Sequence, residues 1–426
     1  MEKITFEDSG KIIRVGDCLE TNTIRSWLSA SGTIPKSIIT SEEALKNLRN
    51  KYPLILKDFP TLRIKVITKD NLYYLHYASN EEIQFDNLFK IVESKILDEV
   101  PIPNKSIESL LWRVEISQIE NKTKIKVSAS HSIIDGRGIF DLLDIFTLCA
   151  LNKEFNEKLN NYKNQPVLYE YGKKDWFTKE FLMKDLINPY EKVNLSTTIL
   201  NPPIETPSYV INHQWNVEYP PILKFCKKHN VSPQAILMAI QNEAIRIFNK
   251  GKYDDIPIGV QFAIDCRNSI YATETFKRSL FFTHSGISVS YLHPEKDILE
   301  NIKKSALILK DSSMVNQSCE SVYFIANMRN EKTGEMINTT KFPNPNCYIF
   351  ASHIGLVGVG LDDIQFRMYS FVYKNMYWPN LYGYHNKETF SFVFEIPYNT
   401  PEEYLKSVKN TSLKYYDFIV NNIKEE

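Results

Sequence analysis

His131, Asp135 and Gly136 form a His-x-x-x-Asp-Gly motif in the first half of the chain. The histidine side chain has an ordinary pKa of about 6.5, so its neutral imidazole can accept a proton at pH 7. The Asp135 carboxylate lies four residues further on and can fix the turn, while Gly136 permits a tight backbone approach. The motif therefore predicts a general base that is aimed by a rigid turn.

The residues on either side of the motif predict a strand and a helix. Ile125, Val127 and Ala129 alternate with polar residues, as in a strand that buries one face. The apolar spacing from about 138 to 150 predicts a helix directly after the turn. His131 would thus stand at the end of a strand, where its side chain can reach a cleft.

The rest of the first half predicts one more helix and two hairpins. Thr40 and Glu43 form a capping box, and we expect Pro53 to end the helix that follows. Two pairs of strand-like segments, within residues 62–77 and 110–130, are each separated by a short polar turn. These pairs are typical of an antiparallel sheet.

The second half repeats this mixture of helices and strands. Ser232 can cap a helix that has Pro233 in its first turn and Gly251 after its end. A further helix is expected near 294–309 and a last one after Pro401. Strand-like segments lie between these helices and are expected within 256–267, 281–292, 347–355, 364–373 and 389–398.

Helices and strands alternate in both halves, which predicts an α/β fold of the α+β sandwich type. We expect two domains of similar size, at 1–160 and 205–426. The stretch 161–204 is rich in Asn, Lys, Tyr and Pro and lacks periodicity, so it is expected to be a connecting or lid region.

Composition excludes several classes of function. The 426 residues contain 51 Lys and Arg against 51 Asp and Glu, so no net charge attracts nucleic acid. No apolar stretch reaches the roughly 20 residues that a membrane span requires. The amino terminus has no apolar secretory segment and the six cysteines are scattered, which predicts a cytoplasmic protein with reduced thiols and no metal site.

The motif resembles that of the condensation-domain and alcohol acetyltransferase branch of the chloramphenicol acetyltransferase-like superfamily. Three further segments resemble this family in the expected order. FAIDCRNS at 262–269 resembles its Asp-x-Arg strand, SPQAILMAIQNEAI at 232–245 the preceding helix, and ASHIGLVGVG at 351–360 its Ser-Asn-x-Gly segment. The resemblance covers most of the chain and implies two similar domains with mixed sheets and an active-site tunnel between them.

The resemblance also assigns roles to residues of the motifs. It implies that His131 is a general base and that Asp135 is a structural residue held in an ion pair by Arg267. Asp265 and Arg267 would face the same side of a strand, so that Asp265 can in turn hold Arg267. Several polar residues stand where the family lines its tunnel or binds the oxyanion, although a place on surface loops remains an equal alternative; they are Thr283, His284, Ser285, Ser352 and His353.

Differences between this sequence and the family's motifs narrow the class of substrate. Condensation domains usually carry a second histidine directly before the catalytic one, and that position is Ser130 here. The Asp-Phe-Gly-Trp-Gly segment of the plant acyltransferases is missing, and His353 stands where asparagine is common. These differences favour a microbial-type alcohol O-acyltransferase. The phosphates of a coenzyme A donor would need local cations, for which Lys277 and Arg278 are candidates, with a solvated strand end as the alternative.

We therefore expect an acyltransferase that moves an acyl group from acyl-coenzyme A to a small alcohol acceptor. Neutral His131 would take the acceptor's proton, without a metal, a permanently bound cofactor or an acyl-enzyme. Two alternatives stay open. The first is a condensation-type transferase that uses a carrier-protein-bound acyl group or an amine acceptor, and the second is a non-catalytic binding module on the same fold.

Overall fold

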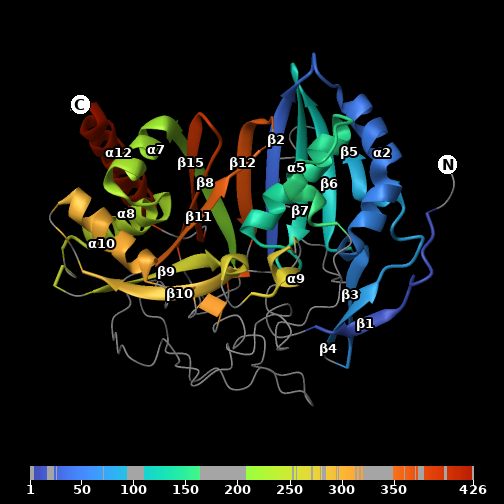
Figure 1. Cartoon of the computed structure of the whole chain (residues 1–426), viewed down its shortest axis with the longest axis horizontal. Coiled ribbons are helices and arrows are strands. Elements are labelled where there is room, and N and C mark those ends of the chain that lie inside the picture. Colours follow the sequence, from blue (N-terminus) through green and yellow to red (C-terminus); the bar gives the residue numbers. More distant parts are fainter. Residues whose placement is uncertain are drawn as a thin grey trace.

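In the residues that the computed structural model describes, the strands form three sheets with helices packed against them (Figure 1). It describes residues 4–16, 24, 26–70, 72–93, 110–163, 208–251, 254–255, 257–269, 272–278, 280, 285–293, 295, 297–311, 314–315, 318–319, 349–358, 360–369, 371–372, 379–397 and 401–424. From residue 164 on, the predicted connecting region 161–204 lies outside these ranges, and the predicted domain division stays a prediction.

The first half builds a five-stranded sheet, in the order β12-β2-β7-β6-β5, and a three-stranded sheet, in the order β1-β4-β3. Helices α2 and α5 lie against one face of the larger sheet (Figure 1). The elements are β1 (Ile12–Val15), β2 (Trp27–Pro35), α2 (Ser41–Asp58), η1 (Pro60–Arg63), β3 (Ile64–Lys69), β4 (Leu72–Tyr77), α3 (Phe85–Leu88), β5 (Phe89–Ile91), β6 (Trp112–Ile119), β7 (Lys122–Ser130), α5 (Gly136–Ala150) and α6 (Glu157–Asn160).

The second half builds a seven-stranded sheet, in the order β10-β9-β11-β14-β15-β8-β13. Helices α7, α8 and α12 pack together and cover one face of it. The elements are β8 (Ser208–Glu218), α7 (Tyr219–His229), α8 (Pro233–Phe248), β9 (Ile258–Asp265), η4 (Cys266–Asn268), α9 (Glu274–Lys277), β10 (Ser285–Leu292), α10 (Ile298–Lys310), β11 (Ile349–Leu356), β12 (Asp362–Tyr369), β13 (Phe371–Val372), β14 (Asn380–His385), β15 (Thr389–Pro397) and α12 (Glu402–Lys424).

Strand β12 links the two halves. It follows β11 of the seven-stranded sheet in the chain, yet it pairs antiparallel with β2 at the edge of the five-stranded sheet. The side-chain amide of Asn212 on β8 hydrogen bonds both the N–H and the C=O of Met368, and the Tyr384 hydroxyl donates to the Ile364 carbonyl at 2.8 Å. Side chains of the second sheet therefore hold the edge strand of the first.

The α/β fold class with mixed sheets is confirmed. Strand β11 runs parallel to β9 and β14, whereas β15 and β8 are antiparallel. Both predicted hairpins form, β3 with β4 and β6 with β7. The Thr40 capping box is present, and Ser232 caps α8. The helix expected near 294–309 forms as α10, beginning four residues later.

The prediction that Pro53 ends its helix is wrong, because α2 continues to Asp58. Proline removes one backbone hydrogen bond from a helix interior, a cost that tertiary packing can offset. Tyr52, Ile55 and Leu56 are fully buried against the first core, and the Tyr52 hydroxyl donates to the Ile83 carbonyl at 2.7 Å. Burial of this last turn therefore outweighs the missing bond.

The two faces of the five-stranded sheet differ in polarity. One face carries apolar side chains such as Leu28, Val127 and Val114, which join the first hydrophobic core beneath α2 and α5. The alternate residues of the same strands are polar and mostly buried, among them Ser29, Ser128 and Lys126. Among the described residues, no helix has the length and apolar character needed to cross a membrane.

Candidate active site

Strand β7 delivers His131 to the turn before α5. Val127 and Ala129 are fully buried, so the strand is anchored in the first core up to the motif. The backbone N–H of Ser130 donates to the Leu111 carbonyl, and that of His131 donates to the Ser26 carbonyl, both at 2.7 Å. The backbone of the motif is thereby tied to the strand ends on either side, while the His131 residue itself remains partly exposed.

The His131 ring is held in one tautomer by its own turn. Its Nδ1 lies 2.8 Å from the Ile134 carbonyl oxygen, which can only accept a hydrogen bond, so Nδ1 carries the proton. In the neutral ring Nε2 is then the basic nitrogen. Burial lowers the pKa of His131 below its usual 6.5, although the Ile134 carbonyl and Asp135 act in the opposite direction. The imidazole is therefore neutral at pH 7 and able to accept a proton.

Asp135 fixes the turn that aims this ring. It is the N-cap of α5, and its Oδ1 accepts a hydrogen bond from the Gly138 N–H at 2.7 Å. Its Oδ2 accepts from Arg267 Nη1 at 2.9 Å, which is the ion pair that the resemblance implies. Asp135 is fully buried and Arg267 is 8% exposed, so this pair lies inside the protein.

Arg267 does not lie on a strand, which corrects the expectation for Asp265 and Arg267. Strand β9 ends at Asp265, and Arg267 follows in the 3-10 turn η4. Asp265 still holds the arginine, because its Oδ1 accepts from the Arg267 backbone N–H at 3.0 Å and from Nη1 at 3.1 Å. Burial alone would lower the pKa of Arg267, but Asp135 and Asp265 outweigh it and raise that pKa. The guanidinium is thus charged.

The tight backbone approach expected at Gly136 occurs at Gly138 instead. A Cβ added to Gly136 would meet only the Ile354 side chain at 3.6 Å, an ordinary contact. A Cβ at Gly138 would lie 2.6 Å from Ile134 Cγ1 and 2.9 Å from the Leu280 carbonyl oxygen. The sequence signal for this glycine was its place two residues after Gly136, in the first turn of the helix.

We expect Gly138→Ala to destabilise the protein by about 1–3 kcal/mol, because the new methyl group has no room beside Ile134 and the Leu280 carbonyl. Gly136→Ala is the matched control in the same turn, and we expect it to be neutral or stabilising by up to about 1 kcal/mol. Urea unfolding of both variants measures the two effects. Equal stability of the two variants would contradict this assignment.

Ser130 has a structural place rather than one facing the motif histidine. It is fully buried, its hydroxyl hydrogen bonds the Ile24 carbonyl at 3.0 Å, and it lies 2.8 Å from the Ser132 hydroxyl. Ser130 therefore braces the chain around His131.

Ser352 and His353 lie next to each other on β11 and so face opposite sides of the sheet. The His353 ring stacks on His385 and Phe390, at centroid distances of 5.4 and 5.9 Å. Burial, with His385 and Arg137 nearby, lowers the pKa of His353 to about 3. These contacts place His353 against Phe390 of the second core, with Arg137, the residue after Gly136 of the motif, nearby.

The remaining predicted site residues are placed only in part. Thr283 and His284 lie outside the described residues. Ser285 is the first residue of β10, and only its backbone is among the described parts of the structure. Lys277 Nζ pairs with Glu274 at 2.9 Å, and the Arg278 guanidinium lies 3.8 Å from the same carboxylate. Within the described part of the chain, no group of three or more His, Cys, Asp or Glu side chains could hold a metal ion.

No family model and no curated protein matches this sequence. Solved structures do match it over nearly its whole length. The epimerization domain from the third module of tyrocidine synthetase B superposes with a TM-score of 0.68 at 10% identity, covering 99% of this chain and 100% of that domain.

Two further solved structures are similar. One is TRI101 of F. sporotrichioides complexed with coenzyme A and T-2, with a TM-score of 0.58 at 11% identity, covering 93% of this chain and 96% of that one. The other is a structure that shows the molecular basis for condensation domain-mediated chain release from the enacyloxin polyketide synthase. It has a TM-score of 0.55 at 11% identity, covering 99% of this chain and 84% of that one. The chain therefore has the same fold as these proteins.

Proposed function

We propose that this protein is an acyltransferase in which His131 is the general base. The observation that carries the proposal is the bond from Nδ1–H to the Ile134 carbonyl, which leaves Nε2 as the basic nitrogen of a neutral ring. The His131 residue is partly exposed. The fold supports the same chemistry, because proteins with this fold include one complexed with coenzyme A.

The proposed step is a direct transfer. Nε2 takes the proton of the acceptor hydroxyl as its oxygen bonds to the thioester carbonyl carbon, forming a tetrahedral oxyanion. The carbon–sulfur bond then breaks, and the imidazolium returns the proton to the departing thiolate. Asp135 is bound to Arg267 and to the Gly138 N–H, so it positions the histidine turn and does not share the proton.

Acyl-coenzyme A and a small alcohol are the proposed donor and acceptor. Support comes from the TRI101 complexes with coenzyme A and from Ser130, which replaces the histidine common in condensation domains. Lys277 and Arg278 remain the proposed contacts of the coenzyme phosphates, and their shared partner Glu274 cancels only one of the two charges.

A second candidate is condensation-type transfer of a carrier-bound acyl group, or transfer to an amine acceptor. It is supported by the similarity to the epimerization domain of tyrocidine synthetase B and to the enacyloxin condensation domain structure. The same His131 base would serve both candidates, because a carrier arm and coenzyme A present the same thioester.

Thiol release distinguishes the candidates. Acetyl-coenzyme A is mixed with the protein and a panel of alcohols, and the free thiol is followed with and without acceptor. We expect alcohol-dependent release. Turnover of a carrier-bound acyl group alongside silence with acetyl-coenzyme A would overturn the choice of donor, and silence with both donors and with amine acceptors would favour the binding-module alternative.

The pH dependence of kcat/KM tests the protonation state of the base. Because burial lowers the pKa of His131 below 6.5, the reactive neutral form is fully present above that pH and is lost as the pH falls through the lowered pKa. We expect kcat/KM to increase with pH, with the midpoint of this increase below pH 6.5, and to be constant above about pH 7.5. A midpoint above 6.5, or the same profile in His131→Ala, would argue against this base.

A further inference from the structure

The seven-stranded sheet forks where β9 and β11 end. The two strands run parallel, and they pair over Ile349–Ala351 of β11 and Val260–Phe262 of β9. Beyond these residues β11 stays paired with β14 as far as Leu356, and β9 stays paired with β10 as far as Asp265. The carboxyl-terminal parts of β9 and β11 are therefore not paired with each other, and we call them the two arms of the fork.

A side chain of α8 replaces β9 as the partner of the β11 arm. The Gln234 amide donates to the Ala351 carbonyl at 2.8 Å, and its oxygen accepts from the His353 N–H at 2.6 Å. Backbone groups that lose their ladder partner need such a substitute, because an unpaired buried backbone group is costly. The fork is thus a stable feature of the sheet.

The motif turn and the first turn of α5 contact both arms of the fork. On the β9 side, Asp135 forms its buried ion pair with Arg267, which follows β9 in η4. On the β11 side, Arg137 Nη1 donates to the Leu356 carbonyl. The turn that carries His131 is therefore held from both arms.

A β-bulge shapes the β11 arm at this contact. The register of β11 against β14 shifts between His353 and Gly355, so Ile354 is the extra residue. The Ile354 side chain reaches the motif, since a Cβ added to Gly136 would lie 3.6 Å from it. Gly355 has a φ of +100°, which residues with a side chain rarely adopt. The bulge thus brings β11 against the start of α5.

The Arg137 guanidinium is also anchored on its own helix. Its Nη2 donates to Asp141 Oδ1 at 2.9 Å, one turn further along α5. Asp141 is buried, and its carboxylate also accepts from Lys158 Nζ at 2.6 Å and from the Tyr162 hydroxyl at 3.1 Å. Both terminal nitrogens of the guanidinium are therefore bound to protein, one to α5 and one to β11.

The two histidines near Arg137 do not repel it. Burial lowers the pKa of His353 to about 3 and also lowers the pKa of His385, and the guanidinium acts in the same direction on both. Both rings are therefore neutral at pH 7, and the guanidinium lies near them without a like charge.

We propose that Arg137 is a positioning residue that docks the motif turn onto β11 and so fixes His131 relative to the seven-stranded sheet. Arg267 holds the turn from one arm of the fork and Arg137 from the other. Without Arg137 the turn keeps its ion pair but loses its polar bond to β11. The effect on turnover rests on the proposed function, in which His131 is the base, whereas the docking does not.

Arg137→Met removes the guanidinium and keeps an unbranched apolar side chain. We expect kcat to fall by about 10–100-fold, because a base displaced by about 1 Å can lose this much. The KM of donor and acceptor should change by less than about threefold, because the guanidinium is bound to protein. The fold should survive, since Phe140 of α5 still packs on Tyr384 of β14 with ring centroids 5.1 Å apart.

Two further variants separate positioning from a merely structural role. Arg137→Lys keeps the charge, but its single nitrogen replaces two that are bound at opposite ends, so its kcat should lie between those of Arg137→Met and the wild type. Lys158→Met is the matched control, because it removes a cation from the same Asp141 carboxylate and Lys158 Nζ bonds that carboxylate rather than β11. We expect Lys158→Met to keep near-normal kcat.

Amide hydrogen exchange tests the docking without a substrate. In peptides that cover 131–141 and 352–358, we expect exchange about threefold to tenfold faster in Arg137→Met than in the wild type, because the lost bond lets the contact open more often. Lys158→Met should exchange as the wild type does in 352–358. If this pattern is seen while the wild type turns over no thioester, the docking stands and the proposed function fails.

Unchanged exchange in Arg137→Met, or an equal increase in Lys158→Met, would overturn the docking. With an active wild type, a kcat of Arg137→Met at the wild-type level would overturn the positioning role. An effect confined to the KM of the coenzyme A donor would also overturn it, since Arg137 would then bind the donor.

Discussion

His131→Ala is expected to slow acyl transfer by about 10²–10⁴-fold, the usual contribution of a positioned general base. The fold should survive, because the backbone bond of residue 131 to the Ser26 carbonyl does not involve the side chain. The loss should appear in kcat as well as in kcat/KM, because the base acts on the bound acceptor during the chemical step.

His76→Ala is the matched control for this variant. The His76 Nδ1 also lies at hydrogen-bond distance from a backbone carbonyl, that of Tyr77 at 2.7 Å, but on strand β4 of the three-stranded sheet. The His76→Ala variant loses the same kind of hydrogen bond and should keep near-normal turnover. Near-normal turnover of His131→Ala would contradict the mechanism, as would an equal loss in both variants.

Asp135→Ala and Arg267→Ala should each lower the free energy of unfolding by about 3–5 kcal/mol, because each leaves a buried charge without its partner. Asp135→Ala also removes the cap of α5, which adds about 1 kcal/mol to its cost. Activity should fall in parallel, since the turn that aims His131 loosens. The double variant should be less destabilised than the sum of the two single variants.

A double-mutant cycle in urea unfolding measures this coupling. The exposed pair Lys122 and Asp363 provides a control cycle, in which each single variant should cost less than about 1 kcal/mol. If the Asp135 and Arg267 losses were fully additive, the two side chains would be energetically independent and the pair would not hold the turn.

Local patterns in the sequence were enough to predict the elements around the motif. The alternation of Ile125, Val127 and Ala129 gave strand β7, and these three side chains are fully buried. The capping signals at Thr40 and Ser232 begin α2 and α8 as expected. Such signals depend on neighbouring residues only, which is why one sequence reveals them.

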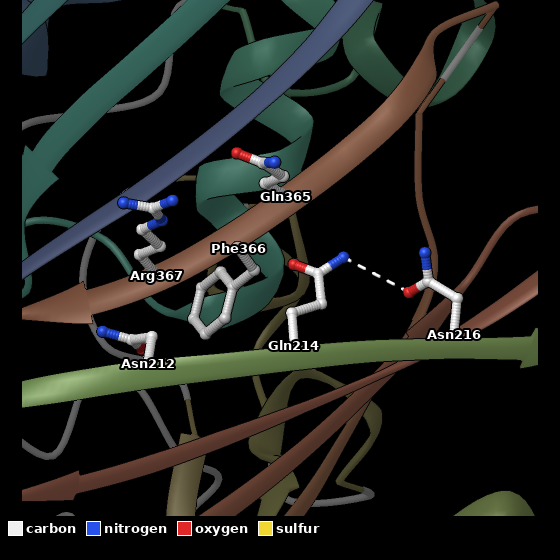
Figure 2. Close-up of a pocket in the computed structure, with 6 residues that line it drawn as sticks. All are labelled: Asn212, Gln214, Asn216, Gln365, Phe366 and Arg367. Carbon is white, nitrogen blue, oxygen red and sulfur yellow. Dashed lines mark hydrogen bonds between the residues drawn. The ribbon is translucent and has the colours of Figure 1, made fainter. Parts of the chain in front are cut away.

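Long-range packing decided the features that the sequence did not reveal. The place of β12 beside β2 depends on two residues of other strands. Asn212 of β8 lies 156 residues before its partner Met368, and Tyr384 of β14 lies 20 residues after its partner Ile364. Gly138 is required by its neighbour Ile134 and also by the Leu280 carbonyl, which belongs to a distant segment. A pocket that is lined by Asn212, Gln214 and Asn216 of β8 and by Gln365, Phe366 and Arg367 of β12 likewise brings together distant segments (Figure 2). No local pattern records such contacts.

The central claim, that His131 catalyses transfer of an acyl group from a thioester, is tested most directly by detection of the product. Carbon-13 acetyl-coenzyme A is incubated with an alcohol panel and either wild-type protein or His131→Ala, and labelled ester is quantified by mass spectrometry together with the thiol released. We predict that wild-type protein forms ester and thiol in equal amounts and that His131→Ala lowers both by about 10²-fold or more. Labelled ester formed at wild-type rates by His131→Ala, or its absence with the wild type across the whole panel, would contradict the account.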